Sequence, residues 1–322
     1  MTSAVPVGRS VHVKVPATSA NLGPGFDTLG LALSAYDELE VTAVTATGAR
    51  VAVHGVGEGE VPTDETNLVV QAIAYTFADQ RQEMPGIEVT ARNIIPHGRG
   101  MGSSGAAIVS GIMAAKGLLD GIVELDSDDL LRIATEMEGH PDNVAPALFG
   151  GLTIAWVEPG AEGGPEAPLR PRSKKLMVHR GVSPVVFVPE HTMSTRLARS
   201  LQPISVPHED AVFNVSRSSL LIAALIQSPE LLFAATEDKL HQNYRAAAMP
   251  QTSELIALLR SHGYAAVVSG AGPSVLVLCS DPAQRLAAAD LVAKEAHTPW
   301  RAHMLAVDFK GATVGIASRG AA

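Results

Sequence analysis

Apolar and polar residues alternate along several short stretches of the chain and recur at helical spacing along others. Alternation is typical of a half-buried β-strand, whereas apolar residues three and four positions apart are typical of an amphipathic helix. The predicted strands cover residues 10–17, 39–44, 50–56, 86–95, 148–157 and 176–188, with a strand pair within 265–279. The predicted helices cover residues 66–82, 128–138, 194–201, 211–235 and 253–262, with another after the glycine-rich stretch near residue 100. This irregular order of strands and helices predicts an α+β fold and not alternating βαβ units.

The length of the chain predicts two domains. Its 322 residues exceed the usual size of one compact core, and domains of about 150 residues are typical. Residues 158–172 are dense in Pro and Gly, as in flexible connectors. We therefore predict an N-terminal domain over residues 1–165 and a C-terminal domain over residues 166–322.

Composition and charge exclude several classes of protein. The net charge is -9, with 24 Lys and Arg against 33 Asp and Glu, so no basic surface is expected to neutralise a nucleic acid. The single cysteine, Cys279, excludes an internal disulfide framework and a cysteine-rich metal site. The first residues lack the pattern of a signal peptide, and no apolar run of about 18 residues occurs. The prediction is a cytoplasmic protein without membrane or nucleic-acid partners.

Residues 96–111, with the sequence PHGRGMGSSGAAIVSG, form the most informative stretch. They follow a predicted strand and open a helix of small residues. Four glycines let the backbone turn sharply and approach a ligand closely. We expect Ser103 or Ser104 to be the N-cap of the helix, whose unpaired N–H groups and positive dipole end attract anions. The stretch predicts a phosphate site.

Two familiar phosphate loops compare poorly with this stretch. A Walker A loop needs a Lys before the Ser or Thr, and none is present. The dinucleotide pattern G-x-G-x-x-G is matched by Gly100, Gly102 and Gly105, with Glu124 near the place of a ribose-binding acid. However, Glu124 lies in an acidic segment that is typical of a helix start. A nicotinamide-dependent dehydrogenase and a tight turn without ligand stay open as alternatives.

Three segments together resemble a known family. They are VKVPATSANLGPGFDTLG at 13–30, the loop from residue 96, and VVSGAGPSVLVL at 267–278. They are similar to the three motifs of the galactokinase, homoserine kinase, mevalonate kinase and phosphomevalonate kinase (GHMP) superfamily. The first motif, with EGHPDNVAPALFGG at 138–151 and STRLAR at 194–199, resembles the homoserine kinase branch. The resemblance implies the two-domain GHMP kinase fold: an N-terminal domain like domain 2 of ribosomal protein S5, and a C-terminal ferredoxin-like α/β sandwich.

The resemblance also implies an activity. It is the ATP- and Mg²⁺-dependent phosphorylation of the side-chain hydroxyl of L-homoserine, a step of threonine biosynthesis, with homoserine and ATP as small-molecule partners and a homodimer as a possible assembly. A kinase of the same fold acting on another small alcohol, such as mevalonate or shikimate, is the first alternative. A catalytically silent small-molecule sensor of this fold is another.

The resemblance assigns site residues by position. Implied nucleotide-binding residues are Asn67, Pro96, His97, Gly98, Arg99, Gly100, Met101, Gly102, Ser103, Ser104, Gly105 and Ala106. The implied Mg²⁺ ligands are Ser104 and Glu136. Implied substrate-binding residues are Asn21, Asp27, His140, Asn143, Thr195, Arg199 and Arg245, and Asn143 and Arg199 are also assigned to catalysis. Two arginines suit a substrate carboxylate because the guanidinium group is planar and binds carboxylates through paired hydrogen bonds.

The sequence departs from the wider superfamily where a base would stand. Other members pair an Asp base with a Lys near the first motif, but here residues 17–19 are Ala-Thr-Ser. The resemblance to homoserine kinases implies that the base position falls on Asn143, whose amide cannot take a proton at neutral pH. The adjacent Asp142 stays open as a base. We favour transfer without a protein base, in which the hydroxyl passes its proton late to the γ-phosphoryl group.

Overall fold

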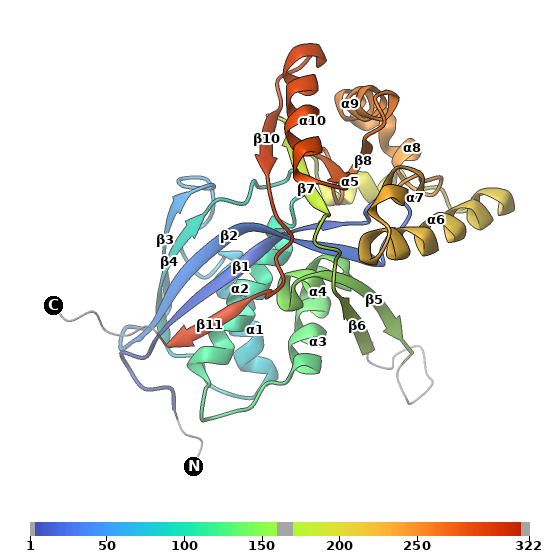
Figure 1. Cartoon of the computed structure of the whole chain (residues 1–322). Helices are drawn as coiled ribbons and strands as arrows, with labels where there is room; N and C mark the ends of the chain where they lie inside the picture. Colours follow the sequence, from blue (N-terminus) through green and yellow to red (C-terminus); the bar gives the residue numbers. More distant parts are fainter. Residues whose placement is uncertain (1–3, 160–169, 317–322) are drawn as a thin grey trace.

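The structure of the protein, a computed structural model, describes residues 4–159 and 170–316. These residues form a seven-stranded sheet and a four-stranded sheet, each with its own helices (Figure 1). The α+β prediction is confirmed. None of the helices in the described ranges combines the length and apolar character needed to cross a membrane.

The seven-stranded sheet is built around two long antiparallel strands, β1 (Ser10–Ala20) and β2 (Leu29–Val44). It is completed by β3 (Ala49–Gly55), β4 (Gly86–Asn93), β5 (Leu152–Glu158), β6 (Arg170–Leu176) and β11 (Thr313–Ile316). Its order is β11-β1-β2-β4-β3, with β5 paired to β2 and β6 to β5. The sequence pattern does not predict the first half of β2, because residues 29–33 are buried on both faces and do not alternate.

Helices cover one face of this sheet (Figure 1). They are α1 (Leu68–Asp79), α2 (Ser103–Leu118), α3 (Ser127–Glu138) and α4 (Pro141–Phe149). α2 is buried on nearly all sides, which its Gly, Ala and Ser residues permit because neighbouring backbones can approach it closely. A side chain at Gly111 would meet α1 at Ala72, and one at Gly117 would meet β1 at Val11. α2 is therefore a central element that carries the glycine-rich loop at its N-terminus.

The four-stranded sheet is antiparallel, in the order β10-β7-β9-β8. Its strands are β7 (Ser183–Val188), β8 (Ala265–Val268), β9 (Val275–Cys279) and β10 (Arg301–Met304). α9 (Pro250–Ser261) and α10 (Pro282–Glu295) pack on it. The remaining helices are α5 (Thr195–Ser200), α6 (His208–Ile226), α7 (Leu232–Ala235), α8 (Gln242–Arg245) and the short 3₁₀ helices η1 (Pro229–Leu231) and η2 (Ala246–Ala248).

Two predicted elements need correction. The single helix predicted over residues 211–235 is three elements, α6, η1 and α7, because Pro229 has no N–H to continue α6. The connector predicted over residues 158–172 includes the ends of the β5–β6 hairpin. The predicted domain division at residue 165 falls in 160–169, outside the described residues. Beyond it, β6 and β11 complete the first sheet, so the chain returns to that sheet after building the second.

Candidate active site

The three glycine-containing motifs meet between the two sheets. The Ser269 hydroxyl donates to the Gly100 carbonyl at 2.6 Å, and its oxygen lies 2.9 Å from Ser19 Oγ. The Gly270 N–H donates to the Ala20 carbonyl at 3.2 Å. Residues far apart in the sequence thus hold one another through short backbone contacts, and glycine at these points allows the approach.

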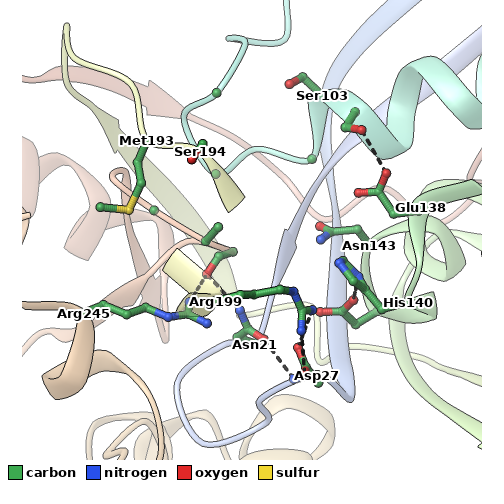
Figure 2. A pocket seen from close by; sticks show the side chains of 18 residues that line it. Asn21, Asp27, Ser103, Glu138, His140, Asn143, Met193, Ser194, Arg199 and Arg245 are labelled. Carbon is green, nitrogen blue, oxygen red and sulfur yellow. Dashed lines mark hydrogen bonds and ion pairs between the residues drawn. The ribbon is translucent and has the colours of Figure 1, made fainter. Parts of the chain in front are cut away.

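A cavity of about 180 Å³ lies at this junction (Figure 2). Six predicted substrate residues line it: Asn21, Asp27, His140, Asn143, Arg199 and Arg245. Gly98, Gly100, Gly102, Ser103 and Ser104 of the glycine-rich loop line it too, with Glu138, Asp142, Met193, Ser194 and residues 270–272. Thr195 begins α5, but its side chain lies outside what the structure describes; its neighbour Ser194 contributes to the wall.

The glycine-rich loop leaves the N-terminus of α2 uncapped. Gly98, Gly100 and Gly102 have φ values of 62°, 71° and 70°, in the left-handed region that glycine adopts without strain. The N-cap of α2 is Gly102, with no side-chain hydrogen bond, so the expected Ser103 or Ser104 cap is wrong. The first N–H groups of an α-helix have no partner within the helix. Here no cap takes them either, which suits an anion.

A carboxylate reaches the same corner from α3. Ser104 Oγ donates to Glu138 Oε2 at 2.9 Å (Figure 2). Burial raises the pKa of the Glu138 carboxyl, against the hydrogen bond from Ser104 and the charges of His140 and Arg199, which lower it. A positive charge bound beside this carboxylate would stabilise its ionised form.

The predicted partner of Ser104 needs correction. The carboxylate of Glu136 accepts hydrogen bonds from Tyr75 Oη at 3.0 Å and from Arg132 Nη1 at 3.1 and 3.2 Å. Two positions along a helix are a rotation of about 200°, so Glu136 and Glu138 point to different sides of α3. Glu138 is the carboxylate at the cavity. It belongs to the EGHPDN segment, but sequence alone does not show the rotation of α3 toward α2.

Asp27 and Arg199 form a two-point ion pair across the cavity. Arg199 Nη1 and Nη2 donate to the two oxygens of Asp27 at 3.2 and 2.9 Å. Asn21 supports Asp27, since its Oδ1 accepts from the Asp27 N–H at 3.0 Å. Its Nδ2 donates to the Gly270 carbonyl at 2.8 Å. Asn21 thus holds the first motif against the last one, and only part of its hydrogen-bonding capacity is left for a ligand.

Arg245 is a buried cation at the cavity wall. It is 2% exposed, and its guanidinium lies 5.2 Å from the ring centre of Phe26. Its Nη1 is 3.4 Å from the Gly270 carbonyl, and no carboxylate of the described residues forms an ion pair with it. Burial lowers the pKa of Arg245, against the charge of Asp27. An unpaired buried cation is costly, so the site is suited to an incoming anion.

His140 and Asp142 form a second pair. Their Nδ1 and Oδ1 atoms are 2.6 Å apart, and Asp142 is 2% exposed. Burial lowers the pKa of His140, but the hydrogen bond and the charge of Asp142 together raise it by more than burial lowers it. The pKa of His140 is therefore above its ordinary value. Both side chains line the cavity, and the hydrogen bond to His140 occupies Oδ1 of the Asp142 carboxylate.

A second, mainly apolar cavity of about 290 Å³ adjoins the first. Ser103 and Ser104 line both cavities. Asn67 and His97 line the second, among valines of β3 and β4 and the start of α1. Asn67 also caps α1, since its Oδ1 accepts from the Val69 N–H at 3.0 Å. The two cavities therefore adjoin at the first turn of α2.

The other predicted nucleotide residues lie elsewhere. Met101, Gly105 and Ala106 are buried beneath the loop. Pro96 and Arg99 line a separate cavity of about 570 Å³. Arg99 donates to the carbonyls of Pro189, His97 and Glu190 at 2.9, 3.1 and 2.5 Å, so it ties the loop to the segment after β7. In residues 4–159 and 170–316, no three His, Cys, Asp or Glu side chains cluster as metal ligands.

The chain matches known family models and known proteins. The model for the GHMP kinases N terminal domain matches residues 67–151, and the model for the GHMP kinases C terminal matches residues 221–297. The homoserine kinase of Clavibacter michiganensis is 72% identical over 322 residues, covering 100% of this chain and 99% of that protein. The chain belongs to the homoserine kinase family of the GHMP kinases.

Other relatives agree with this family. The homoserine kinase of Leifsonia xyli is 73% identical over 307 residues, or 95% of this chain and 92% of that protein. The crystal structure of homoserine kinase from Cytophaga hutchinsonii superposes with a TM-score of 0.79 at 26% identity, covering 96% of this chain and 98% of that one. The predicted superfamily and its two-domain fold are confirmed.

Proposed function

We propose that this protein transfers the γ-phosphoryl group of ATP to the side-chain hydroxyl of L-homoserine, yielding O-phospho-L-homoserine on the route to threonine. One observation carries the proposal. A single cavity has an uncapped helix N-terminus and a Ser–Glu pair at one side, and Asp27, Arg199 and Arg245 at the other. The first side suits phosphates and the second suits an amino acid.

ATP would lie over the N-terminus of α2. The apolar cavity beside Asn67 and His97 has the character needed for a purine base, and Ser103 and Ser104 lead from it to the loop. The triphosphate would then receive backbone N–H groups at the start of α2. Ser104 and Glu138 fit Mg²⁺, which takes oxygen ligands and is commonly bound by one or two carboxylates together with substrate phosphates. When bound, the ion would neutralise charge on the phosphates.

The charges opposite the loop favour a zwitterion. Arg245 would bind the substrate carboxylate, joined by Arg199 once that residue leaves Asp27, and Asp27 would bind the ammonium group. The empty site is partly neutralised by the Asp27–Arg199 pair, which a ligand with both charges can replace. Mevalonate and shikimate carry a carboxylate but no ammonium, and would leave Asp27 without a partner. The site therefore supports homoserine over the first alternative.

Catalysis would rest on position and charge. Arg199 lies near enough to Glu138 and His140 for its charge to lower the pKa of both. Its charge therefore acts on the proposed Mg²⁺ ligand Glu138 as well as on Asp27. Asn143 would orient the homoserine hydroxyl. The hydroxyl oxygen forms a bond to the γ-phosphorus, the bond to the bridging oxygen breaks, and its electron pair leaves with ADP. The hydroxyl proton passes to the transferred phosphoryl group, because Asn143 cannot accept it and Asp142 is bound to His140.

An ADP-release assay with matched substrates tests the proposal. We expect ADP release with ATP, Mg²⁺ and L-homoserine, and only background release with mevalonate, shikimate or 4-hydroxybutyrate, which lacks the ammonium group. Release with mevalonate but not homoserine would overturn the substrate. ATP binding without turnover on any of these compounds would favour the sensor alternative. The cytoplasmic location and the homodimer remain predictions, which cell fractionation and sedimentation can check.

A further inference from the structure

Thr18 lies directly behind the cavity wall and not on it. It is near the end of β1, is 1% exposed, and is absent from the set of residues that line the cavity. Its Oγ1 donates to Asn143 Oδ1 at 3.1 Å, across 125 positions of sequence. Thr18 is thus the nearest described partner of the amide that we expect to orient the reacting hydroxyl.

The surroundings of Thr18 hold its side chain in place. Its N–H donates to the Met101 carbonyl at 3.1 Å. A Cβ atom on Gly102 would run into Thr18 Oγ1, so the missing side chain at the N-cap of α2 makes room for this hydroxyl. A β-branched residue also has few χ1 rotamers. The hydroxyl is therefore fixed between the glycine-rich loop and the first turn of α4.

This hydrogen bond favours one orientation of the Asn143 amide, with Oδ1 toward Thr18. A hydroxyl has one proton to give, and in the described residues Asn143 Oδ1 is the acceptor recorded for it. With Oδ1 held at the wall, Nδ2 is the atom left for the cavity. Figure 2 shows Asn143 between Glu138 and His140. In the turned-over amide Nδ2 would donate to Thr18 Oγ1, but the buried Thr18 proton would lose Asn143 Oδ1 as its acceptor, and an unsatisfied buried donor is costly.

We propose that Thr18 is a positioning residue for phosphoryl transfer, which fixes Asn143 so that the reacting hydroxyl meets a hydrogen-bond donor and no acceptor. The inference rests on the proposed function. Asn143 Nδ2 donates to one lone pair of the homoserine hydroxyl oxygen, which directs another lone pair at the γ-phosphorus. The amide takes no proton in the step.

Replacement of Thr18 by Val tests the role, since Val keeps the shape and removes the hydroxyl. We expect Thr18→Val to lower kcat about 10- to 100-fold through lost alignment, with KM for ATP nearly unchanged. Thr18→Ser keeps the hydroxyl and should restore most of kcat. Thr76→Val is the matched control: Thr76 is also buried and also loses one hydroxyl hydrogen bond, but within α1. Its kcat should equal that of the wild type.

A double-mutant cycle separates positioning from general support of the fold. If Thr18 acts through Asn143, Thr18→Val should cost little further kcat in an Asn143→Leu background. Equal losses in both backgrounds would overturn the inference. Asn143→Asp gives an independent measurement if Thr18→Val does not fold. That variant presents an acceptor and should lose activity, whereas a gain would contradict the need for a donor.

The wild-type enzyme separates this inference from the proposed function. If it fails to phosphorylate homoserine, the substrate assignment fails. If it phosphorylates homoserine and Thr18→Val keeps full kcat, the assignment stands and the role of Thr18 fails.

Discussion

The hydroxyl of Ser104 lies 2.9 Å from the carboxylate of Glu138, joining the first turn of α2 to the last residue of α3. Gly139 follows Glu138 with a φ of 92°, a left-handed conformation that ends the helix. The chain then turns into His140 and the start of α4. One hydrogen bond thus connects the helix that follows the glycine-rich loop to the segment that carries His140, Asp142 and Asn143.

We predict that this pair controls the response to Mg²⁺. Ser104→Ala and Glu138→Gln should each reduce the affinity for Mg²⁺ or the activity about 10- to 100-fold, which is the usual range for changes around a bound metal. Glu136→Gln is the matched control, because its carboxylate faces Tyr75 and Arg132 and not the cavity. The measurement is kcat against Mg²⁺ concentration, after circular dichroism verifies folding.

A contrary pattern is easy to recognise. If Glu136→Gln shifts the Mg²⁺ dependence and Glu138→Gln does not, the assignment of Glu138 fails. In that case the carboxylate implied by sequence resemblance would be the ligand after all, through a rearrangement of α3.

The error of two positions on α3 illustrates what sequence patterns can supply. Glycines and serines before a helix have local consequences, so the turn into α2 could be predicted from residues 96–111 alone, and its binding of phosphate stays a prediction. Which face of α3 meets α2 depends on packing between helices, and both Glu136 and Glu138 are compatible with the helical pattern. The sequence pointed to α3 but could not show which of its two carboxylates faces the cavity.

The partners of the charged residues also could not be predicted from the sequence. Asp27 and Arg199 are 172 positions apart, and no local rule brings them together. Arg245 was predicted as a substrate residue from resemblance, but its burial without an acidic partner follows only from the packing of α8 against Phe26. Resemblance to the family therefore named Asp27, Arg199 and Arg245 as candidates, and the tertiary structure set their partners.

Arg245→Met should separate binding from stability. Loss of a charged hydrogen bond to the substrate carboxylate should cost about 1.5 to 3 kcal/mol, or roughly 10- to 150-fold in KM for homoserine. KM for ATP should stay close to that of the wild type. The empty variant should have an equal or higher Tm, because removing a buried unpaired charge relieves its desolvation cost.

Arg217→Met is the control for the Arg245 experiment, since Arg217 pairs with Glu237 at the α6 surface. Its homoserine KM should not change. A lower Tm for Arg245→Met, with both KM values raised together, would instead mean that Arg245 supports the fold.

Asp37 should make stability depend on pH. Its Oδ1 accepts from the N–H groups of Ile94 and Ile95 at 2.7 and 2.9 Å, just before the phosphate loop. Burial raises the pKa of Asp37 to about 6 from 3.8, against these two hydrogen bonds. The folded protein therefore holds this proton more tightly than the unfolded chain, and the contribution of Asp37 to stability falls as pH rises from about 4 to 6.

Asp37→Asn keeps an oxygen acceptor and removes the titration. We expect the variant to gain stability relative to the wild type between pH 4.5 and 7.5, by at most about 3 kcal/mol for a shift of two pKa units. Urea unfolding at both pH values measures the difference. An unchanged difference between the two proteins across this range would mean that Asp37 does not titrate there.

The last prediction concerns the proton of the homoserine hydroxyl. If Asp142 were the base, Asp142→Asn should cost about 10²- to 10⁴-fold in kcat. The structure places that carboxylate against His140, so we expect a smaller loss of kcat and a change in the titration of His140.

Asp142 raises the pKa of His140, so the Asp142→Asn variant should have a lower His140 pKa, which NMR titration of the imidazole can follow. The raised pKa stabilises the folded wild type below about pH 6.5, and this contribution disappears as pH rises through the folded pKa. The stability lost in Asp142→Asn should accordingly be greater at pH 5.5 than at pH 8. A loss of kcat of several thousandfold, with disappearance of the acidic limb of its pH profile, would make Asp142 the base and overturn transfer without one.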